Sequence, residues 1–380
     1  MRAARLAALA ACAAALSGCG SFHPFGLFLD ADKKPMPLVE FKATVTPRVV
    51  WSASVGKAGD FKFTPAVDGN RIFAAAADGT ITVVDTGKGT VVARIDTQRK
   101  LSSGAGGTAE TVIVGTIKGE VAAFDLSGKQ KWVASVAGEV LAPVVVAGSH
   151  AIVRTADGRI FALALASGKR EWVYQRPMPS LLLRADTSVL VTPTNVVAGY
   201  PGGKLIALDL DDGKLTWEVT VSFPRGATEL ERVADVSGMP VVDGQRICAA
   251  AYQGKVGCFE IQSGNTLWTR DISSSQSLAV DDKSLYVTDD QENVHALDRE
   301  NGASRWKQAK LLRRGLTAPV AVDGKVVVGD AFGYLHVLAK DDGAMIGRIA
   351  LDGGAVRALV PADGGLVVQT AGGTLAFVRF

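Results

Sequence analysis

Short stretches of alternating apolar and polar residues follow one another along nearly the whole chain after Val49. A period of two is typical of β-strands that bury one face, and no stretch of twelve or more residues has the 3.6-residue period of an amphipathic helix. Asp-Gly pairs, which favour tight hairpin turns, separate many of these stretches. They begin at Asp68, Asp78, Asp157, Asp243 and Asp323. The pattern predicts an all-β protein built from short hairpins.

A longer unit repeats within this pattern and is clearest from Lys204 to Trp217. It consists of a strand, a polar turn that contains glycine, and a second strand with tryptophan four residues after the glycine. This tryptophan occurs at Trp132, Trp172, Trp217, Trp268 and Trp306, and Trp51 lies in a similar strand at the start. All-β units repeated at about 40 residues are typical of propeller blades. We expect each indole to be a core side chain that covers the gap between neighbouring sheets.

The number of units predicts the architecture. Outer strands begin near Trp51, Ala93, Trp132, Trp172, Trp217, Trp268, Trp306 and Gly347. The last group of three inner strands ends at Phe380 without an outer strand, whereas the strand around Trp51 has no inner group before it. We therefore predict an eight-bladed β-propeller of four-stranded antiparallel blades, in which the N-terminal strand completes the last blade. Because Ala93 and Gly347 replace tryptophan, we expect weaker packing at those two blade junctions.

The N-terminal region does not follow the blade pattern. Two arginines precede an apolar stretch, Leu6 to Leu16, which is too short to span a membrane and is typical of a secretory signal. Leu16-Ser-Gly-Cys19 resembles a bacterial lipobox, and this resemblance implies cleavage before Cys19 and acylation of that residue. Gly20 follows instead of Asp, which in the enteric sorting rule implies the outer membrane. A plain signal peptide with a chance cysteine is the alternative.

Prolines punctuate the segment that follows Cys19 and favour an extended spacer. The predicted organisation is therefore a signal peptide at residues 1–18, a lipidated tether at 19–46 and the propeller at 47–380. The chain has 41 Lys and Arg against 38 Asp and Glu, and two of the arginines belong to the signal. Such a near-neutral body gives no indication of nucleic-acid binding.

Cys248 and Cys258 lie on two strands of one expected hairpin. A three-residue turn around Gln253-Gly254 would place them directly opposite, whereas a two-residue turn would offset them by one. An exported protein can form a disulfide, and both a disulfide and two buried thiols remain open. The histidines are scattered, without metal-ligand spacing. They are His23, His150, His295 and His336. No catalytic constellation or cofactor motif is visible, so we expect a protein that is not an enzyme.

Two segments depart from the blade pattern. The connection from Ser222 to Gly238 is long for a propeller, and such loops are usually functional or disordered. In Leu181-Leu-Leu-Arg-Ala-Asp186, three leucines lead directly into an arginine. Either the leucines belong to a core strand with Arg184 in solvent, or they form an exposed patch with the composition of a protein-binding hot spot.

The repeat itself, Ala207-x-Asp209 followed by Gly213-Lys214 and Trp217, resembles the tryptophan-docking repeat of quinoprotein alcohol dehydrogenases. The adjacent cysteine pair and calcium ligands of those enzymes are not visible in this sequence. The lipobox, the length and three segments resemble instead the BamB family, propeller lipoproteins of the outer-membrane β-barrel assembly (BAM) machinery. These segments are 228–236, 317–320 and 328–336.

The BamB resemblance implies a non-catalytic scaffold at the periplasmic face of the outer membrane, which binds the POTRA domains of BamA and aids insertion of β-barrel proteins. It implies a monomer within a larger complex, with unfolded outer-membrane proteins as a further candidate partner. The docking residues that it implies are Leu181, Leu183, Arg184 and Asp235. Ser237 stands where the family often has a second acid, so Asp235 would have to act alone. The alternative function is a periplasmic quinoprotein-like enzyme or small-molecule binder that uses the central funnel.

Overall fold

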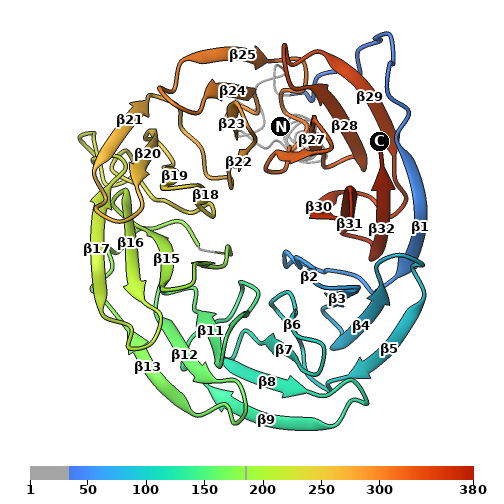
Figure 1. Ribbon diagram of the computed structural model, residues 1–380, viewed down its shortest axis with the longest axis vertical. Coiled ribbons are helices and arrows are strands. Elements are labelled where there is room, and N and C mark those ends of the chain that lie inside the picture. Colours follow the sequence, from blue (N-terminus) through green and yellow to red (C-terminus); the bar gives the residue numbers. More distant parts are fainter. Residues whose placement is uncertain (1–33, 185) are drawn as a thin grey trace, which may run out of the picture. The chain divides into compact units, whose positions relative to one another are not determined.

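Eight four-stranded antiparallel sheets surround a central axis in the part of the chain that the structure describes (Figure 1). A computed structural model describes residues 34–184 and 186–380, and Met36–Phe380 forms one unit. The predicted signal peptide and Cys19 lie outside the described residues. No helix is present among the residues described, and hence none that could cross a membrane. The prediction of an eight-bladed propeller is confirmed.

In every blade the first strand named below is the innermost and the last is the outermost. Blade 1 contains β2 (Ala66–Asp68), β3 (Arg71–Ala75), β4 (Thr80–Asp85) and β5 (Val91–Asp96), and blade 2 contains β6 (Gly106–Gly107), β7 (Val112–Gly115), β8 (Glu120–Phe124) and β9 (Gln130–Ser135). Blade 3 contains β10 (Val145–Ala147), β11 (His150–Arg154), β12 (Ile160–Ala164) and β13 (Arg170–Tyr174), and blade 4 contains β14 (Leu190–Val191), β15 (Asn195–Tyr200), β16 (Lys204–Asp209) and β17 (Leu215–Thr220). Blade 5 contains β18 (Val241–Asp243), β19 (Arg246–Ala250), β20 (Val256–Glu260) and β21 (Thr266–Arg270), and blade 6 contains β22 (Ala279–Val280), β23 (Ser284–Thr288), β24 (Val294–Asp298) and β25 (Ser304–Gln308). Blade 7 contains β26 (Val320–Val322), β27 (Lys325–Gly329), β28 (Tyr334–Ala339) and β29 (Met345–Ala350), and blade 8 contains β30 (Val356–Ala362), β31 (Gly365–Thr370), β32 (Thr374–Arg379) and β1 (Arg48–Ser54).

The N-terminal strand closes the ring, as predicted. β1 pairs antiparallel with β32, from Arg48 opposite Arg379 to Ser54 opposite Thr374. This pairing satisfies the hydrogen-bonding edge that β32 would otherwise expose, and so removes a template for aggregation.

The six tryptophans join successive blades. Each indole N–H donates to a backbone carbonyl at the start of the turn between the third and fourth strands of the next blade. The pairs are Trp51 with Thr86, Trp132 with Leu165, Trp172 with Leu210, Trp217 with Ile261, Trp268 with Arg299, and Trp306 with Lys340, at 2.8–3.0 Å. Gly213, in the turn that receives Trp172, has φ +71°, and a Cβ there would lie 2.6 Å from the indole ring. Glycine is therefore required both by the turn and by the close approach of the ring. The expectation that the indoles cover the gaps between sheets is confirmed.

The two junctions without tryptophan are built differently. Blade 8 has no turn between its third and fourth strands, because these strands are the two ends of the chain, so a tryptophan at Gly347 would have no such turn to receive it. Val45 and Pro47 approach Gly347 instead, and the Val45 amide donates to the Ile346 carbonyl at 3.0 Å. At the other junction, next to Ala93, Ile95 is the side chain nearest to the receiving glycine, Gly128. That these junctions are weaker stays a prediction.

The N-terminal segment before β1 is attached to blade 7, so the predicted tether at 19–46 extends too far. The Met36 amide donates to Leu312 at 3.0 Å, and Arg314 donates to the Met36 carbonyl at 2.9 Å. Arg348 donates to the Val39 carbonyl at 2.9 Å and lies 4.9 Å from the ring centre of Phe41. The structure thus assigns residues 36–46 to the propeller unit.

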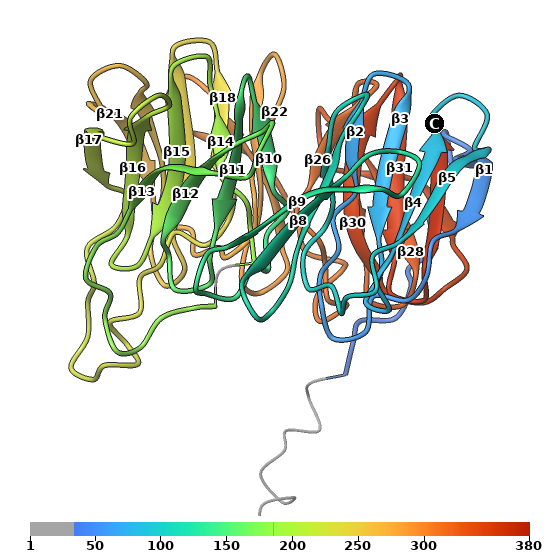
Figure 2. The same cartoon turned by 90° about the horizontal axis from the view of Figure 1, so that it is seen from below.

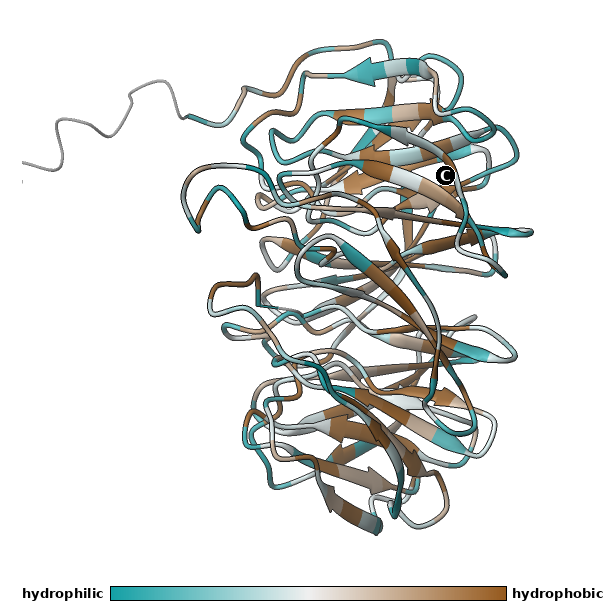
Figure 3. Cartoon of the chain, turned by 90° about the vertical axis from the view of Figure 1, so that its left-hand side faces the viewer, coloured by the Kyte–Doolittle hydropathy of each residue, from teal (hydrophilic) through white to brown (hydrophobic). Residues whose placement is uncertain are grey.

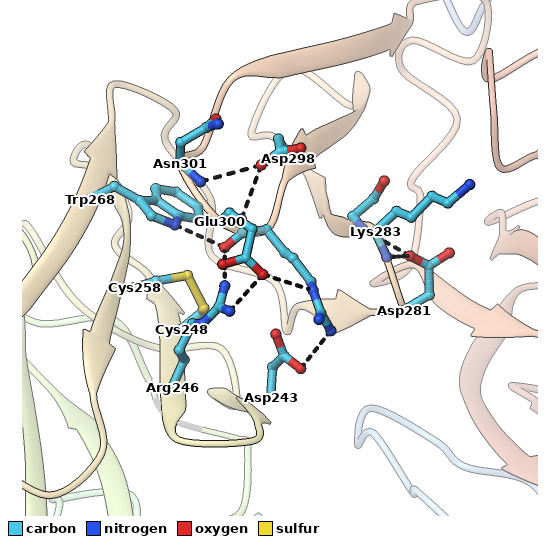
Figure 4. A network of polar contacts seen from close by, with 12 residues as sticks. Asp243, Arg246, Cys248, Cys258, Trp268, Asp281, Lys283, Asp298, Glu300 and Asn301 are labelled. Carbon is cyan, nitrogen blue, oxygen red and sulfur yellow. Dashed lines mark hydrogen bonds and ion pairs between the residues drawn. A yellow bond between two sulfur atoms is a disulfide. The ribbon is translucent and has the colours of Figure 1, made fainter.

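Cys248 and Cys258 form a disulfide, which settles the open alternative. They are directly opposite each other in the β19–β20 ladder, because the Ala251 amide bonds to the Lys255 carbonyl and leaves a three-residue turn. Figure 4 shows the disulfide beside Trp268, whose ladder partner is Cys258. In the same network, Arg246 on blade 5 pairs with Glu300 on blade 6 at 2.6 Å, so charged groups also join these blades.

The ring has two unlike faces. Because strands alternate in direction, the turns that join first to second and third to fourth strands lie on one face, which we call the turn face. The turns between second and third strands and the connections between blades lie on the other, which we call the loop face. Figure 2 shows the ring from its edge, with the long connections projecting below it. Figure 3 shows apolar segments concentrated in the strands and hydrophilic segments at many of the turns.

Candidate functional site

Three successive connections between blades form a continuous surface on the loop face. They are 136–144, 175–184 with 186–189, and 221–240, and together they are called the three-loop surface. The Ser188 hydroxyl donates to the Pro143 carbonyl at 2.8 Å, and the Thr187 hydroxyl donates to the Ser237 carbonyl. The middle connection is therefore bonded to both of its neighbours, and the ring holds these segments side by side although they are far apart in sequence.

The middle connection contains Leu181 to Arg184, and none of these four residues lies in a strand. The alternative of a core strand is therefore wrong. Leu181 is 40% exposed, whereas Leu183 is half-buried and lines a small cavity together with Met178. The Arg184 side chain is 58% exposed and forms an ion pair with Glu139 from the first connection. Leu181 and Arg184 thus present an apolar side chain and a guanidinium to solvent.

Asp235 lies beneath this surface rather than on it, with 3% of the residue exposed. Its carboxylate accepts the Leu183 amide at 2.7 Å and the Gly202 amide at 3.3 Å. Burial raises the pKa of Asp235, and the two amide hydrogen bonds oppose that shift only in part. That Asp235 itself contacts a partner stays a prediction; in this structure its carboxylate bonds to the backbone of the segment that carries the exposed residues.

Ser237, which stands in place of a family acid, bonds within the ring. Its hydroxyl donates to the Ser275 carbonyl at 3.1 Å, in the connection between blades 5 and 6. No charge is present at this position, and its side chain is used to hold adjacent connections together.

The third connection has an ordered tip that the sequence did not reveal. Phe223 and Leu230 are each 68% exposed. The Glu231 carboxylate accepts the amides of Ala227 and Thr228 at 2.7 and 3.1 Å, and these hydrogen bonds lower its pKa. The exposed apolar pair could have been inferred from the unusual mixture of apolar and charged residues in this long connection, but its placement depends on local hydrogen bonds.

A cavity of about 990 Å³ lies at the centre of the ring and is lined by innermost strands and loop-face connections. Two of its acidic side chains have partners within the chain: Asp289 pairs with His295 at 2.8 Å, and Glu292 accepts the Arg314 and Gly315 amides. Among the described residues, no group of three or more His, Cys, Asp or Glu side chains is arranged to hold a metal ion.

Comparison with known proteins supports the resemblance in the sequence. The model of a family described as "Outer membrane protein assembly factor BamB" matches residues 77–308 and 309–379. A protein of that name from Bordetella pertussis is 39% identical, covering 96% of this chain and 94% of the relative. Another, from Burkholderia pseudomallei, is 38% identical and covers 97% of both chains.

Solved structures agree with the fold. The crystal structure of BamB from Moraxella catarrhalis has a TM-score of 0.81 at 27% identity, covering 88% of this chain and all of that one. A quinohemoprotein alcohol dehydrogenase from Comamonas testosteroni, with a TM-score of 0.69 at 13% identity over 87% of this chain and 76% of that one, shares the propeller fold alone. The chain therefore belongs to the BamB family of outer membrane protein assembly factors.

Proposed function

We propose that this chain is a non-catalytic scaffold of the β-barrel assembly machinery, and that it binds the periplasmic POTRA domains of a BamA-like protein through the three-loop surface. The observation that carries the proposal is the joint exposure of Leu181 and Arg184 on a segment bonded to the loops on both sides. Leucine supplies area that binding removes from water, and arginine supplies directed hydrogen bonds.

The support beneath this segment favours binding. Asp235 holds the Leu183 amide, and Ser188 is bonded to the first connection. A segment that is already held in one conformation loses less conformational entropy when a partner binds, so more of the interaction energy contributes to affinity. In this proposal Leu183 and Asp235 fix the conformation of the surface, while Leu181 and Arg184 make direct contact.

The anchor is part of the same proposal. Acylation of Cys19 would hold the protein at the periplasmic face of the outer membrane. About 17 residues separate Cys19 from Met36, the first residue of the propeller unit. At 3.3–3.6 Å each, they span at most about 60 Å. The ring can therefore reach a periplasmic domain near the membrane while it stays anchored.

Substitution of Arg184 tests the proposal. We expect Arg184→Ala to weaken co-purification with a BamA-like partner while leaving the thermal midpoint near that of the wild type, because the side chain is mostly in solvent. Lys214→Ala on the turn face is the matched control, since Lys214 also forms an exposed ion pair. Unchanged capture by the Arg184 variant, or equal loss in both variants, would contradict the proposal.

A further inference from the structure

We propose that Glu139 is a positioning residue that orients Arg184, and that the two side chains together require a partner that presents a carboxylate next to a cation. This inference rests on the proposed docking function. Glu139 belongs to the connection between blades 2 and 3, whereas Arg184 belongs to the next connection, and a guanidinium nitrogen of Arg184 lies 2.5 Å from a carboxylate oxygen of Glu139.

The backbone around Glu139 is held by hydrogen bonds, so the point from which its side chain extends is fixed. The Glu139 carbonyl accepts the Ala156 amide at 2.8 Å, and the next residue, Val140, donates to the Thr116 carbonyl at 3.1 Å. A Cβ at Gly138 would lie 3.1 Å from the Thr155 side chain, so this turn packs closely on blade 3. Arg184 also lies outside the strands, and the hydrogen bond recorded for it is the one from its side chain to Glu139. The ion pair therefore fixes the arginine more than the glutamate.

The pair leaves binding capacity on both sides. A guanidinium has five N–H donors in a planar fork, and the structure records one hydrogen bond from Arg184 to Glu139. The Glu139 side chain is 42% exposed, so its carboxylate is open to solvent as well. A partner carboxylate can bind the free edge of the guanidinium, provided that a cation beside it offsets repulsion from Glu139.

The Glu139–Arg184 pair affects which charge pattern a partner can present more than it affects the folding stability of the chain. An exposed ion pair contributes little to folding, because both charges remain hydrated and screened. Its value in binding is that an oriented arginine does not have to be ordered by the partner. A partner surface with only acidic groups would be repelled by the Glu139 carboxylate, and a surface with only basic groups would be repelled by the Arg184 guanidinium.

A double-mutant cycle tests the inference, with the full chain and the purified periplasmic region of a BamA-like protein. Glu139→Gln should raise the dissociation constant about fivefold in the wild-type background, a loss typical of one oriented charge contact. In the Arg184→Ala background, the same substitution should have almost no effect, because Glu139 acts through Arg184. Glu300→Gln is the control, since Glu300 pairs with Arg246 at the blade 5–blade 6 junction.

A charge swap separates orientation from simple stabilisation. The double variant Glu139→Arg with Arg184→Glu should keep the wild-type thermal midpoint but not recover binding, because the ion pair is retained and the charge pattern is reversed. The inference is overturned if Glu139→Gln binds like the wild type, if it weakens binding equally in both backgrounds, or if the swap restores affinity. If Arg184→Ala itself binds normally, the proposed docking function fails instead.

Discussion

The two faces of the ring are built from different kinds of contact. On the turn face the same contact recurs at six blade junctions, where an indole donates to the turn of the next blade. On the loop face the connections between blades differ widely in length: the shortest is 351–355 and the longest is 221–240. Outside the strands, the exposed large apolar side chains of the described residues all lie on this face. They are Ile117, Leu181, Phe223, Leu230, Met239 and Phe332.

This difference has a physical reason. Because the tryptophans and short turns hold adjacent blades together on one face, the connections on the other face do not have to determine the geometry of the ring. Long connections with exposed apolar groups are therefore tolerated there, and rigid scaffolds commonly place binding residues on such loops. We infer that stability is determined mainly at the turn face and recognition mainly at the loop face.

Removal of a tryptophan should have the largest effect on stability. Trp172 is 8% exposed and packs on Gly213, so Trp172→Ala loses buried area and leaves a cavity between blades 3 and 4. We expect the free energy of unfolding to fall by about 3–5 kcal/mol, as measured by denaturant titration. Variant protein that remains folded should still bind the partner with near wild-type affinity. A loss of less than about 1 kcal/mol would mean that the indole is not central to the junction.

Substitution on the three-loop surface should show the opposite behaviour. Leu181→Ser combined with Arg184→Glu removes an apolar contact and reverses a charge, so the dissociation constant for the partner should rise about 30-fold or more, the scale of a binding hot spot. Calorimetric titration measures the affinity, and thermal unfolding provides the control for folding. If the midpoint falls as it does for Trp172→Ala, the separation between the faces is wrong.

Acid should destabilise the ring through a buried cluster beneath the loop face of blade 7. His336 is fully buried against Asp330, and burial lowers the pKa of His336 below its usual 6.5, with Arg348 and Arg314 nearby adding to the shift. Below about pH 6.5 the unfolded chain binds a proton that the folded chain does not, so stability is lost as the pH falls.

We therefore expect the thermal midpoint to fall by a few degrees between pH 7.5 and pH 5, and the fall to be smaller in His336→Gln. Asp330, whose pKa is lowered by its hydrogen bonds to His336, Tyr334 and Arg314, adds a further loss only below about pH 4. An equal fall in the wild type and the variant would show that His336 is not the group responsible.

Asp235→Asn should produce the smallest of these effects. It should distinguish a residue that holds the conformation of the three-loop surface from the residues that contact the partner. Because burial raises the pKa of Asp235, its charge costs stability at neutral pH, and that cost disappears as the pH falls toward the usual carboxyl range. We expect the free energy of unfolding to be unchanged or slightly higher in the variant.

Affinity for the partner should nevertheless fall about threefold to fivefold in Asp235→Asn, since the Leu183 amide loses a charged acceptor. If Asp235→Asn causes a large loss of affinity, and adding Leu181→Ser to it causes no further loss, then the contact made by Leu181 depends entirely on Asp235. No loss would mean that the segment holds its conformation without Asp235.

The ring could be predicted from the sequence because its determinants are local and repeated. The spacing from Gly213 to Trp217 marks a turn and a strand, and the unpaired strand around Trp51 indicates how the ring closes. Predicting the disulfide required only the length of one turn, and the sequence pattern leaves that length uncertain by one residue.

The site was harder to predict because its contacts join segments that only the closed ring brings together. Glu139 occurs in an ordinary short connection, about 45 residues before its partner Arg184. The sequence identified Asp235 by resemblance but could not show that its carboxylate points toward the Leu183 backbone. Prolines suggested a spacer up to residue 46, whereas Phe41 and its contact with Arg348 attach that segment to blade 7.

Hydrogen–deuterium exchange of the full-length protein, alone and with the periplasmic region of a BamA-like protein, tests most directly whether the loop face is the binding surface. Binding should slow the exchange of amides in 136–144, 175–184 and 221–240, while peptides from the tryptophan-receiving turns exchange at the same rate in both states. Slower exchange confined to the turn face or the outer strands would contradict this account.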